Sequence, residues 1–363
     1  AKIRLFAQVI KITERINQIT DKKHGTDKHV KGFNTWSHLV SMIFCQFADC
    51  VSLREISNGL QSANGNLNHL GRLPVRALSP ILLIRTRNAP IRFPETAITS
   101  FGVISTAGKL FERKFCFKNA VLCFCSHHLT LCAEVYGWAH YTHSKGAVKL
   151  HTLQNFSTLL PEYAHITDGK TADNTEVKSG SMDVSDRVYF DTLVLNFWDS
   201  IKVLFVVRVK DNLLYEYMKE RELPDNVHPE VLIDEIVRLR GKETTEQYQN
   251  PYGGLPCTMP GQIHDGTIHQ QHETFAGTIA ALSKARWVIE IFFRSIKQNF
   301  HIKNFVGTSF NAVEIQIWTA LITILLFAVL KQQATYKWHF SNLVSSLRLN
   351  TFTKIVLYQW IIF

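Results

Sequence analysis

The sequence lacks a disulfide framework, an internal repeat and a low-complexity tract. Its seven cysteines are an odd number without a regular spacing, so reduced thiols and a cytoplasmic location are expected. No continuous apolar core follows the charged N-terminal residues, so no signal peptide is indicated. These absences argue against a small secreted scaffold. They favour an ordinary globular protein of 363 residues, with room for two or three domains.

Long hydrophobic runs are also scarce. The one membrane-like run, from Val313 to Leu330, contains Glu314 and Gln316, and its fully apolar part is shorter than a bilayer requires. We therefore expect a buried helix at this position and no membrane partner.

Acidic residues are outnumbered: 30 Asp and Glu stand against 40 Lys and Arg, and the formal net charge is +10. The excess is uneven. Residues 1–36 carry eight basic and three acidic residues, and residues 281–303 carry five basic residues and only Glu290. Residues 214–250 are acidic instead, with nine acids and five bases. This balance favours a polyanionic partner, whose phosphate backbone would meet the basic surfaces.

Residues 1–72 have the pattern of a helical unit. Apolar residues from Trp36 to Phe47 recur at the spacing of an amphipathic helix, and Ser52-Leu53-Arg54-Glu55 is a capping box that opens a second helix. A basic helical unit favours DNA contact slightly over a packing role with incidental charge. Residues 73–114 contain four prolines and no clean period, so a linker is expected there.

The pattern changes from Phe115 onwards, where strands precede helices, as in an α/β layer. The expected strands are Val121–Cys125, Gly146–Leu153, Tyr163–Ile166 and Ile201–Val209. The expected division is a first part of the α/β core at 115–210, a polar insertion at 211–275, a second part at 276–330 and a helical tail at 331–363.

A charged helix face is the most informative local feature. A long helical pattern runs from Thr278 to Phe300, and within it Arg286, Glu290 and Lys297 fall inside an arc of about 40°. A carboxylate flanked by two cations can bind a metal ion and hold DNA phosphates beside it. The alternative is a solvated face with an ordinary Arg–Glu pair one turn apart.

A second acidic pair precedes the expected central strand. Asp186 and Asp191 could offer oxygen ligands to Mg²⁺ or Mn²⁺, although two solvated carboxylates in a surface turn are the common alternative. Cys123, Cys125, His127 and Cys132 raise a third possibility, a zinc site, against which stands the simpler reading of buried strand cysteines.

The ordered combination of these patterns resembles a known family. Asp186-x-x-Tyr189-x-Asp191, followed by Arg286, Glu290 and Lys297 at their spacing, is similar to the DDE transposases of bacterial insertion sequences, in the group with the YREK signature. Other segments also resemble that group: Phe33–Trp36, Ser52–Ser57, Trp138-Ala139, Lys145–Thr152, Asp168–Lys170, Phe205–Asn212, Phe305–Ser309 and Asn311–Trp318.

The resemblance implies an RNase H-like mixed sheet with flanking helices, preceded by an all-helical N-terminal domain and interrupted by an insertion before the last catalytic helix. It further implies three carboxylates that bind two Mg²⁺ or Mn²⁺ ions for strand cleavage and transfer. Asp186 and Glu290 would be the second and third carboxylates and Asp191 an accessory. The implied partners are transposon-end and target double-stranded DNA, bound by a homodimer in the bacterial cytoplasm, at the nucleoid.

The residues that the resemblance expects to contact DNA are Tyr189, Arg286 and Lys297. The sequence departs from the family pattern at four other places. Cys125 stands where the first catalytic Asp is expected, His127-His128 follow it, Ser283 replaces the opening Tyr of the signature, and Val188 replaces a small residue. Because a thiol is a poor ligand for Mg²⁺, we expect strongly impaired cleavage. The alternative is a catalytically inactive DNA-binding remnant.

Overall fold

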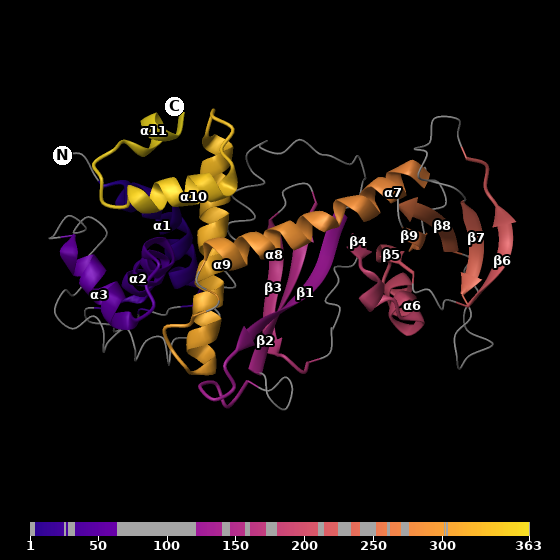
Figure 1. The fold of residues 1–363 in the computed structure, drawn as a ribbon, viewed down its shortest axis with the longest axis horizontal. Coiled ribbons are helices and arrows are strands. Elements are labelled where there is room, and N and C mark those ends of the chain that lie inside the picture. The colour runs from indigo at the N-terminus through magenta and orange to yellow at the C-terminus, as the bar shows by residue number, and fades with distance from the viewer. Residues whose placement is uncertain are drawn as a thin grey trace.

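The computed structural model describes residues 4–24, 27, 33–63, 121–139, 146–156, 160–171, 180–209, 214–223, 234–239, 252–259, 262–269, 276–300, 302 and 304–362. This part of the chain forms a mixed α/β structure: one sheet, crossed by a pair of helices and flanked at one end by a helical bundle (Figure 1). The linker expected at 73–114 lies outside the described residues.

Within the described residues the sheet has nine strands in the order β3-β2-β1-β4-β5-β9-β8-β7-β6. The first five are β1 (Val121–Leu131), β2 (Gly146–Asn155), β3 (Pro161–Asp168), β4 (Met182–Ser185) and β5 (Leu204–Arg208). Strands β1, β2 and β3 pair antiparallel, whereas β1, β4 and β5 pair parallel. This five-stranded mixed arrangement with flanking helices is the expected RNase H-like type.

The range expected to be an insertion, 211–275, contributes four further strands to the same sheet. They are β6 (Tyr215–Glu220), β7 (Glu235–Leu239), β8 (Tyr252–Met259) and β9 (Gln262–His269). Strand β9 pairs antiparallel with β5, with Arg208 opposite Thr267. The insertion therefore extends the sheet directly from its parallel strands.

The N-terminal helices are α1 (Leu5–His24), α2 (Thr35–Ala48) and α3 (Leu53–Ser62). The predicted capping box is present: the Ser52 hydroxyl accepts a hydrogen bond from the Glu55 amide at 3.2 Å. The helix expected from Trp36 to Phe47 is present as α2, but the expectation that one of its faces is exposed to solvent is wrong. Helix α2 is buried on nearly all sides, because other helices cover the face that the pattern left for solvent.

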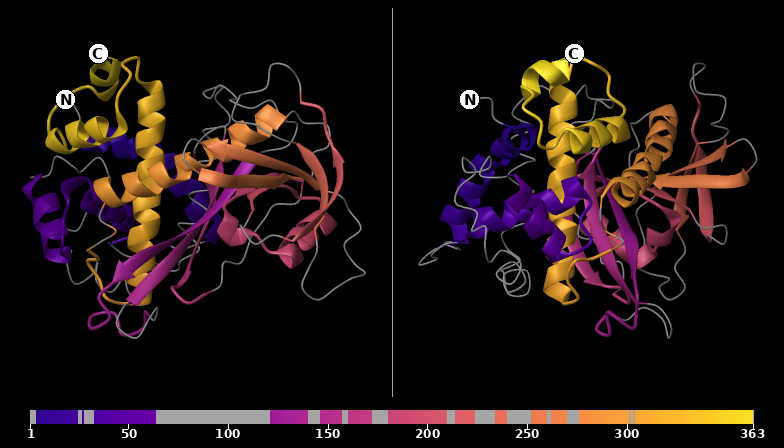
Figure 2. Two further views of the ribbon diagram at one scale, coloured as in Figure 1. Left: turned by 45° about the vertical axis from the view of Figure 1, so that its right-hand side comes forward. Right: turned by 60° about the vertical axis from the view of Figure 1, so that its left-hand side comes forward.

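The C-terminal helices are α9 (Phe310–Gln333), α10 (Phe340–Leu349) and α11 (Leu357–Ile362). Helix α9 is long and apolar enough to span a membrane, yet 89% of its most apolar window is buried inside the protein. Both views in Figure 2 show the N-terminal and C-terminal helices gathered around it. The buried helix expected from Val313 to Leu330 is therefore present.

Two helices run across the sheet in succession: α7 (Ala276–Ala285) and α8 (Trp287–Asn299) (Figure 1). The single helix predicted from Thr278 to Phe300 is thus interrupted. The interruption is a tight turn at Arg286, whose carbonyl accepts a hydrogen bond from the Ile289 amide at 3.0 Å. On the parallel strands, α6 (Thr192–Ser200) packs through Trp198 against Phe205 of β5.

Candidate active site

Asp186 lies at the carboxyl end of β4, where a parallel strand gives way to a short turn. It caps the 3₁₀ turn Arg187–Tyr189, and its Oδ1 accepts a hydrogen bond from the Arg187 amide at 2.8 Å. Strand ends of this kind point side chains into the edge of a sheet, where clefts form. The side chain of Asp186 is 30% exposed.

Glu290 reaches the same place from α8. The guanidinium of Arg286 stands between the two carboxylates: Nη2 is 3.6 Å from Asp186 Oδ2, and Nη1 is 3.6 Å from Glu290 Oε1. The structure thus brings together two side chains that are far apart in sequence and come from different elements. The resemblance implies that these two carboxylates lie close together.

Arg286 is itself largely inside the protein, with 9% of its side chain exposed. Its place at the turn between α7 and α8 directs the guanidinium at the carboxylates. A direct contact between Arg286 and a DNA phosphate, expected from the resemblance, stays a prediction. In this structure both terminal nitrogens face carboxylate oxygens.

Cys125 lies on β1, the strand that pairs in parallel with β4. Strands β1 and β4 pair through Val121–Met182 and Leu122–Asp183, and extending this parallel register places Cys125 opposite Asp186. The prediction that the strand ends at Cys125 is wrong, since β1 continues to Leu131 by pairing with β2. Cys125 is therefore in mid-strand, three residues past Leu122–Asp183, the last parallel pair between β1 and β4.

Neighbouring side chains on the same face of β1 locate Cys125 further. The Cys123 thiol donates to the Val184 carbonyl, and the His127 ring stacks on Phe293 of α8 at 4.9 Å between centroids. Burial lowers the pKa of His127 to about 4, and the Lys297 charge adds to the shift. His127 is therefore neutral at pH 7, and Lys297 supplies the cation at this end of the helix.

Tyr189 is buried between β1 and the turn after β4. Its hydroxyl donates to Ser126 Oγ and accepts from the Ser126 amide, both at 2.9 Å, and its ring meets Phe124 edge-on. This placement gives Tyr189 a role inside the protein and leaves little of it for DNA. Asp191 is exposed and caps α6, accepting a hydrogen bond from the Leu193 amide at 2.8 Å.

Two charged residues near the site were not singled out from the sequence. Arg208, the last residue of β5, has its Nη1 3.9 Å from Asp186 Oδ1. Asp183 is fully buried on β4 and accepts hydrogen bonds from the Phe124 amide and the Ser185 hydroxyl. A charged residue that closes an apolar strand was the available signal for Arg208. Asp183 stands between the apolar residues Met182 and Val184, and the sequence gave no other signal that it would be buried near the site.

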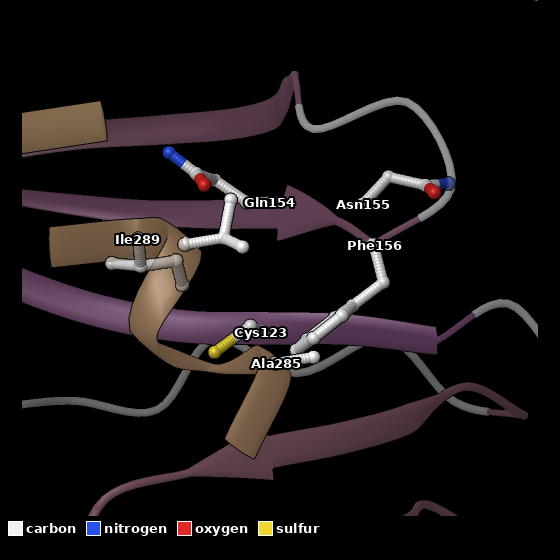
Figure 3. Close-up of a pocket in the computed structure, with 7 residues that line it drawn as sticks. Cys123, Gln154, Asn155, Phe156, Ala285 and Ile289 are labelled. Carbon is white, nitrogen blue, oxygen red and sulfur yellow. The ribbon is translucent and has the colours of Figure 1, made fainter. Parts of the chain in front are cut away.

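A small apolar pocket lies between the strands β1 and β2 and the residues on either side of Arg286 (Figure 3). Its empty volume of about 180 Å³, which includes open solvent, is below that of typical small-molecule sites. The residues that line it are Cys123, Gln154, Asn155, Phe156, Ala285, Val288 and Ile289.

Comparison with known families settles the class of the protein. Residues 124–326 match the family described as a transposase DDE domain, a range that contains Cys125, Asp186 and Glu290. The chain belongs to the DDE transposase family. The resemblance to transposases of bacterial insertion sequences is thereby confirmed at the family level. Residues 2–72 of this transposase match a domain of unknown function, DUF4372.

Two curated relatives carry matching descriptions. The transposase is 28% identical over 203 residues to "Putative transposase y4zB" of Sinorhizobium fredii, an alignment that covers 53% of this chain and 56% of the relative. It is 26% identical over 237 residues to "Probable transposase for insertion sequence element IS5377" of Geobacillus stearothermophilus, covering 64% and 62%. The chain thus spans less than two thirds of the length of each relative.

A solved structure, the piggyBac transposase synaptic complex with hairpin DNA, is similar over 98% of this chain and 80% of its own. The TM-score is 0.45 and the sequence identity 9%, so this likeness carries no argument about the site.

DDE transposase domains generally use divalent metal ions, and the donors of this transposase can be tested against that requirement. Two carboxylates remain, Arg286 faces both of them, and the third position carries the soft thiol of Cys125. Within the described ranges, no group of three or more His, Cys, Asp or Glu residues is placed to hold a metal ion. The residues present therefore do not fit a pair of divalent ions.

The same observation removes the zinc alternative for the described cysteines. The Cys123 thiol is buried and bonded to a carbonyl, and Cys132 is exposed beyond the end of β1. With Cys125 and His127 these residues do not gather around a common point in the part of the chain that the structure describes.

Proposed function

We propose that this chain binds double-stranded DNA at transposon ends and acts in DNA transposition through strand cleavage and transfer, with cleavage strongly impaired in this copy. The observation that carries the proposal is the meeting of Asp186 and Glu290 around Arg286, beside the strand that bears Cys125. Both carboxylates come from the elements that the family pattern assigns to them.

Each residue has a stated part in the proposal. Asp186 and Glu290 supply the oxygen donors that remain of the three-carboxylate set. Cys125 replaces the donor that would complete the set, and a thiol neither bridges hard cations well nor contributes their charge. Removing one electrostatic stabiliser of a reaction costs on the order of 10²- to 10³-fold in rate, and a bridging carboxylate should cost no less.

DNA as the partner is supported by charge and by kinship. The chain has a formal net charge of +10, and both curated relatives are described as transposases. Lys297 on α8, the helix of Glu290, and Arg208 beside Asp186 would contact phosphates. We extend the proposal to a homodimer assembled on paired transposon ends, and to Mg²⁺ or Mn²⁺ as the ion required by a repaired site.

A second candidate is a DNA-binding remnant without catalysis, and one observation favours it. Arg286 and Arg208 both pair with Asp186, so positive charge already stands where a metal ion would be needed. Such a protein would occupy DNA ends without cutting them.

Replacing Cys125 with Asp tests the leading proposal. The substrate is a labelled duplex that carries the inverted repeats flanking the gene, and both nicking and gel-shift affinity are measured with and without Mg²⁺. We expect the wild type to bind but cut poorly, and C125D to cut at least about 100-fold faster with Mg²⁺.

Two control variants accompany that test. Cys125→Ala should gain no activity, and Glu290→Gln in the C125D background should remove the gain. Binding of the duplex without nicking by C125D would favour the remnant, and an absence of binding by all variants would reject DNA as the partner. Nicking by the wild type as fast as by C125D would refute the impairment.

A further inference from the structure

The candidate active site contains its own balancing cations. Asp186 and Glu290 are matched by two guanidiniums, Arg286 and Arg208, so this four-residue cluster carries no formal net charge. A site built to hold two divalent cations would be strongly negative before they bind. The cluster therefore differs in electrostatic character from the one that the family implies.

We propose that Arg286 is a built-in counter-ion of the carboxylate pair, and that with Cys125 in place a divalent cation binds Asp186 and Glu290 together only when this guanidinium is withdrawn. The proposal rests on the assignment of these carboxylates to the site under the proposed function. It does not depend on DNA cleavage.

The contacts show what a metal ion would have to displace. Arg286 directs one terminal nitrogen at each carboxylate, and Arg208 faces the other oxygen of Asp186. Both oxygens of Asp186 and one of Glu290 thus already face positive charge. Mg²⁺ demands near-ideal octahedral geometry and strips water reluctantly, so it competes poorly for oxygens held in this way.

The burial of Arg286 explains why the guanidinium remains. Only 9% of its side chain is exposed, against 30% for Asp186 and 36% for Glu290. Its backbone is held at the helix turn by the bond from its amide to the Leu282 carbonyl at 3.1 Å. An arginine does not deprotonate in a protein, and a buried cation without a partner lowers stability. Arg286 therefore stays paired with Asp186 and Glu290.

The residue at position 125 completes the argument. With an Asp there, the cluster would hold three carboxylates against two guanidiniums, and its net negative charge would draw in a cation. With Cys125, a hard cation gains neither a full charge nor an oxygen donor from this position. Cys125 and the Arg286 counter-ion therefore both weaken the binding of a divalent cation.

Terbium titration tests the proposal on the intact chain without DNA. Tb³⁺ seeks hard oxygen ligands, and its luminescence is sensitised by a nearby indole, here Trp287, the residue after Arg286 on α8. We expect Arg286→Gln to bind Tb³⁺ at least about tenfold more tightly than the wild type. Adding Glu290→Gln to that variant should abolish the gain.

Arg294→Gln is the matched control, since it removes the same charge from an exposed position on the same helix. It should change the Tb³⁺ affinity by less than about twofold, which excludes a general effect of net charge. Circular dichroism checks that each variant is folded, and Arg286→Met, which keeps the buried aliphatic stem, replaces Arg286→Gln if the latter unfolds.

Three outcomes would overturn the proposal: tight Tb³⁺ binding by the wild type at the Glu290-dependent site, equal affinities of the wild type and the Arg286 variants, or a gain that survives Glu290→Gln. If both Arg286 variants unfold, the wild-type titration alone still shows whether the wild type binds Tb³⁺ tightly. Cleavage by C125D is measured separately. If C125D cuts DNA but the Tb³⁺ affinities do not change as expected, the counter-ion proposal fails and the proposed function stands.

Discussion

Asp183, next to the site, has a carboxyl group whose pKa is strongly shifted by its surroundings. Its carboxyl group is fully buried on β4, and burial raises its pKa from 3.8 to about 7, although the Ser185 hydroxyl and the Phe124 amide partly offset the shift. Since the pKa is higher in the folded protein, the folded state binds the proton more tightly. Stability contributed by this group is present at low pH and is lost as pH rises from about 4 to 7.

Asp183→Asn should remove that loss. The amide oxygen can accept from Phe124 as the carboxylate does, and no ionisation remains. We expect the free energy of unfolding at pH 8 to rise by about 1 to 3 kcal/mol, with little change near pH 4. Urea unfolding of both proteins across pH 4 to 8 measures this, and parallel stability curves would contradict it.

At the residue scale, sequence patterns located the site but not its electrostatics. Spacing and kinship selected Asp186, Glu290 and Cys125, and the structure brings Asp186 and Glu290 together around Arg286. The pairing of Arg208 with Asp186 depends on where two parallel strands end relative to each other, which no local pattern encodes. The internal role of Tyr189 was missed for the same reason, since its partner Ser126 is distant in sequence.

Among the elements, the link between β1 and the turn after β4 decides where Asp186 stands. The Tyr189 hydroxyl forms two hydrogen bonds across this junction. It accepts one from the Ser126 amide and donates one to the Ser126 hydroxyl oxygen. We expect Tyr189→Phe to lower the free energy of unfolding by about 1 to 2 kcal/mol, because two part-buried bonds are lost and the ring remains.

Ser126→Ala is the control for that prediction. It removes only the bond to the side-chain oxygen and should cost less than Tyr189→Phe. Thermal and urea unfolding of the two single variants and the double variant give the coupling energy between the residues. A coupling near zero would show that the hydroxyl does not join the two elements.

Element positions were predictable where one signal dominated. The β-branched run became β5, the capping box opened α3, and the long apolar run became α9. The break between α7 and α8 was not predictable, because the helical period continues through Arg286, whose own backbone dihedral angles are helical.

Across the whole molecule, the two ends of the described chain share one core. Phe47 of α2 packs on Phe327 of α9 at 4.8 Å, and Phe44 lies 5.7 Å from Phe352, while the Leu5 amide donates to the Thr353 carbonyl. Such contacts join segments at opposite ends of the sequence. Sequence periodicity marked these residues as apolar but could not pair them.

Phe327→Ala should therefore destabilise the N-terminal and C-terminal helices together. Phe327 is 1% exposed, and removing a buried Phe costs about 3 to 5 kcal/mol. Phe310→Ala, at a residue of the same helix that is 37% exposed, should cost less. Urea unfolding followed by circular dichroism and tryptophan fluorescence should give coincident transitions. Separate transitions would instead support residues 1–72 as an independent domain.

The pairing of β5 with β9 has a mechanical consequence. Arg208 is both a rung of that antiparallel ladder, opposite Thr267, and an ionic neighbour of Asp186. The outer ribbon of β6 to β9 is thus joined to the rest of the sheet at a residue that faces Asp186. A displacement of the ribbon would therefore be transmitted through β5 to the cation beside Asp186.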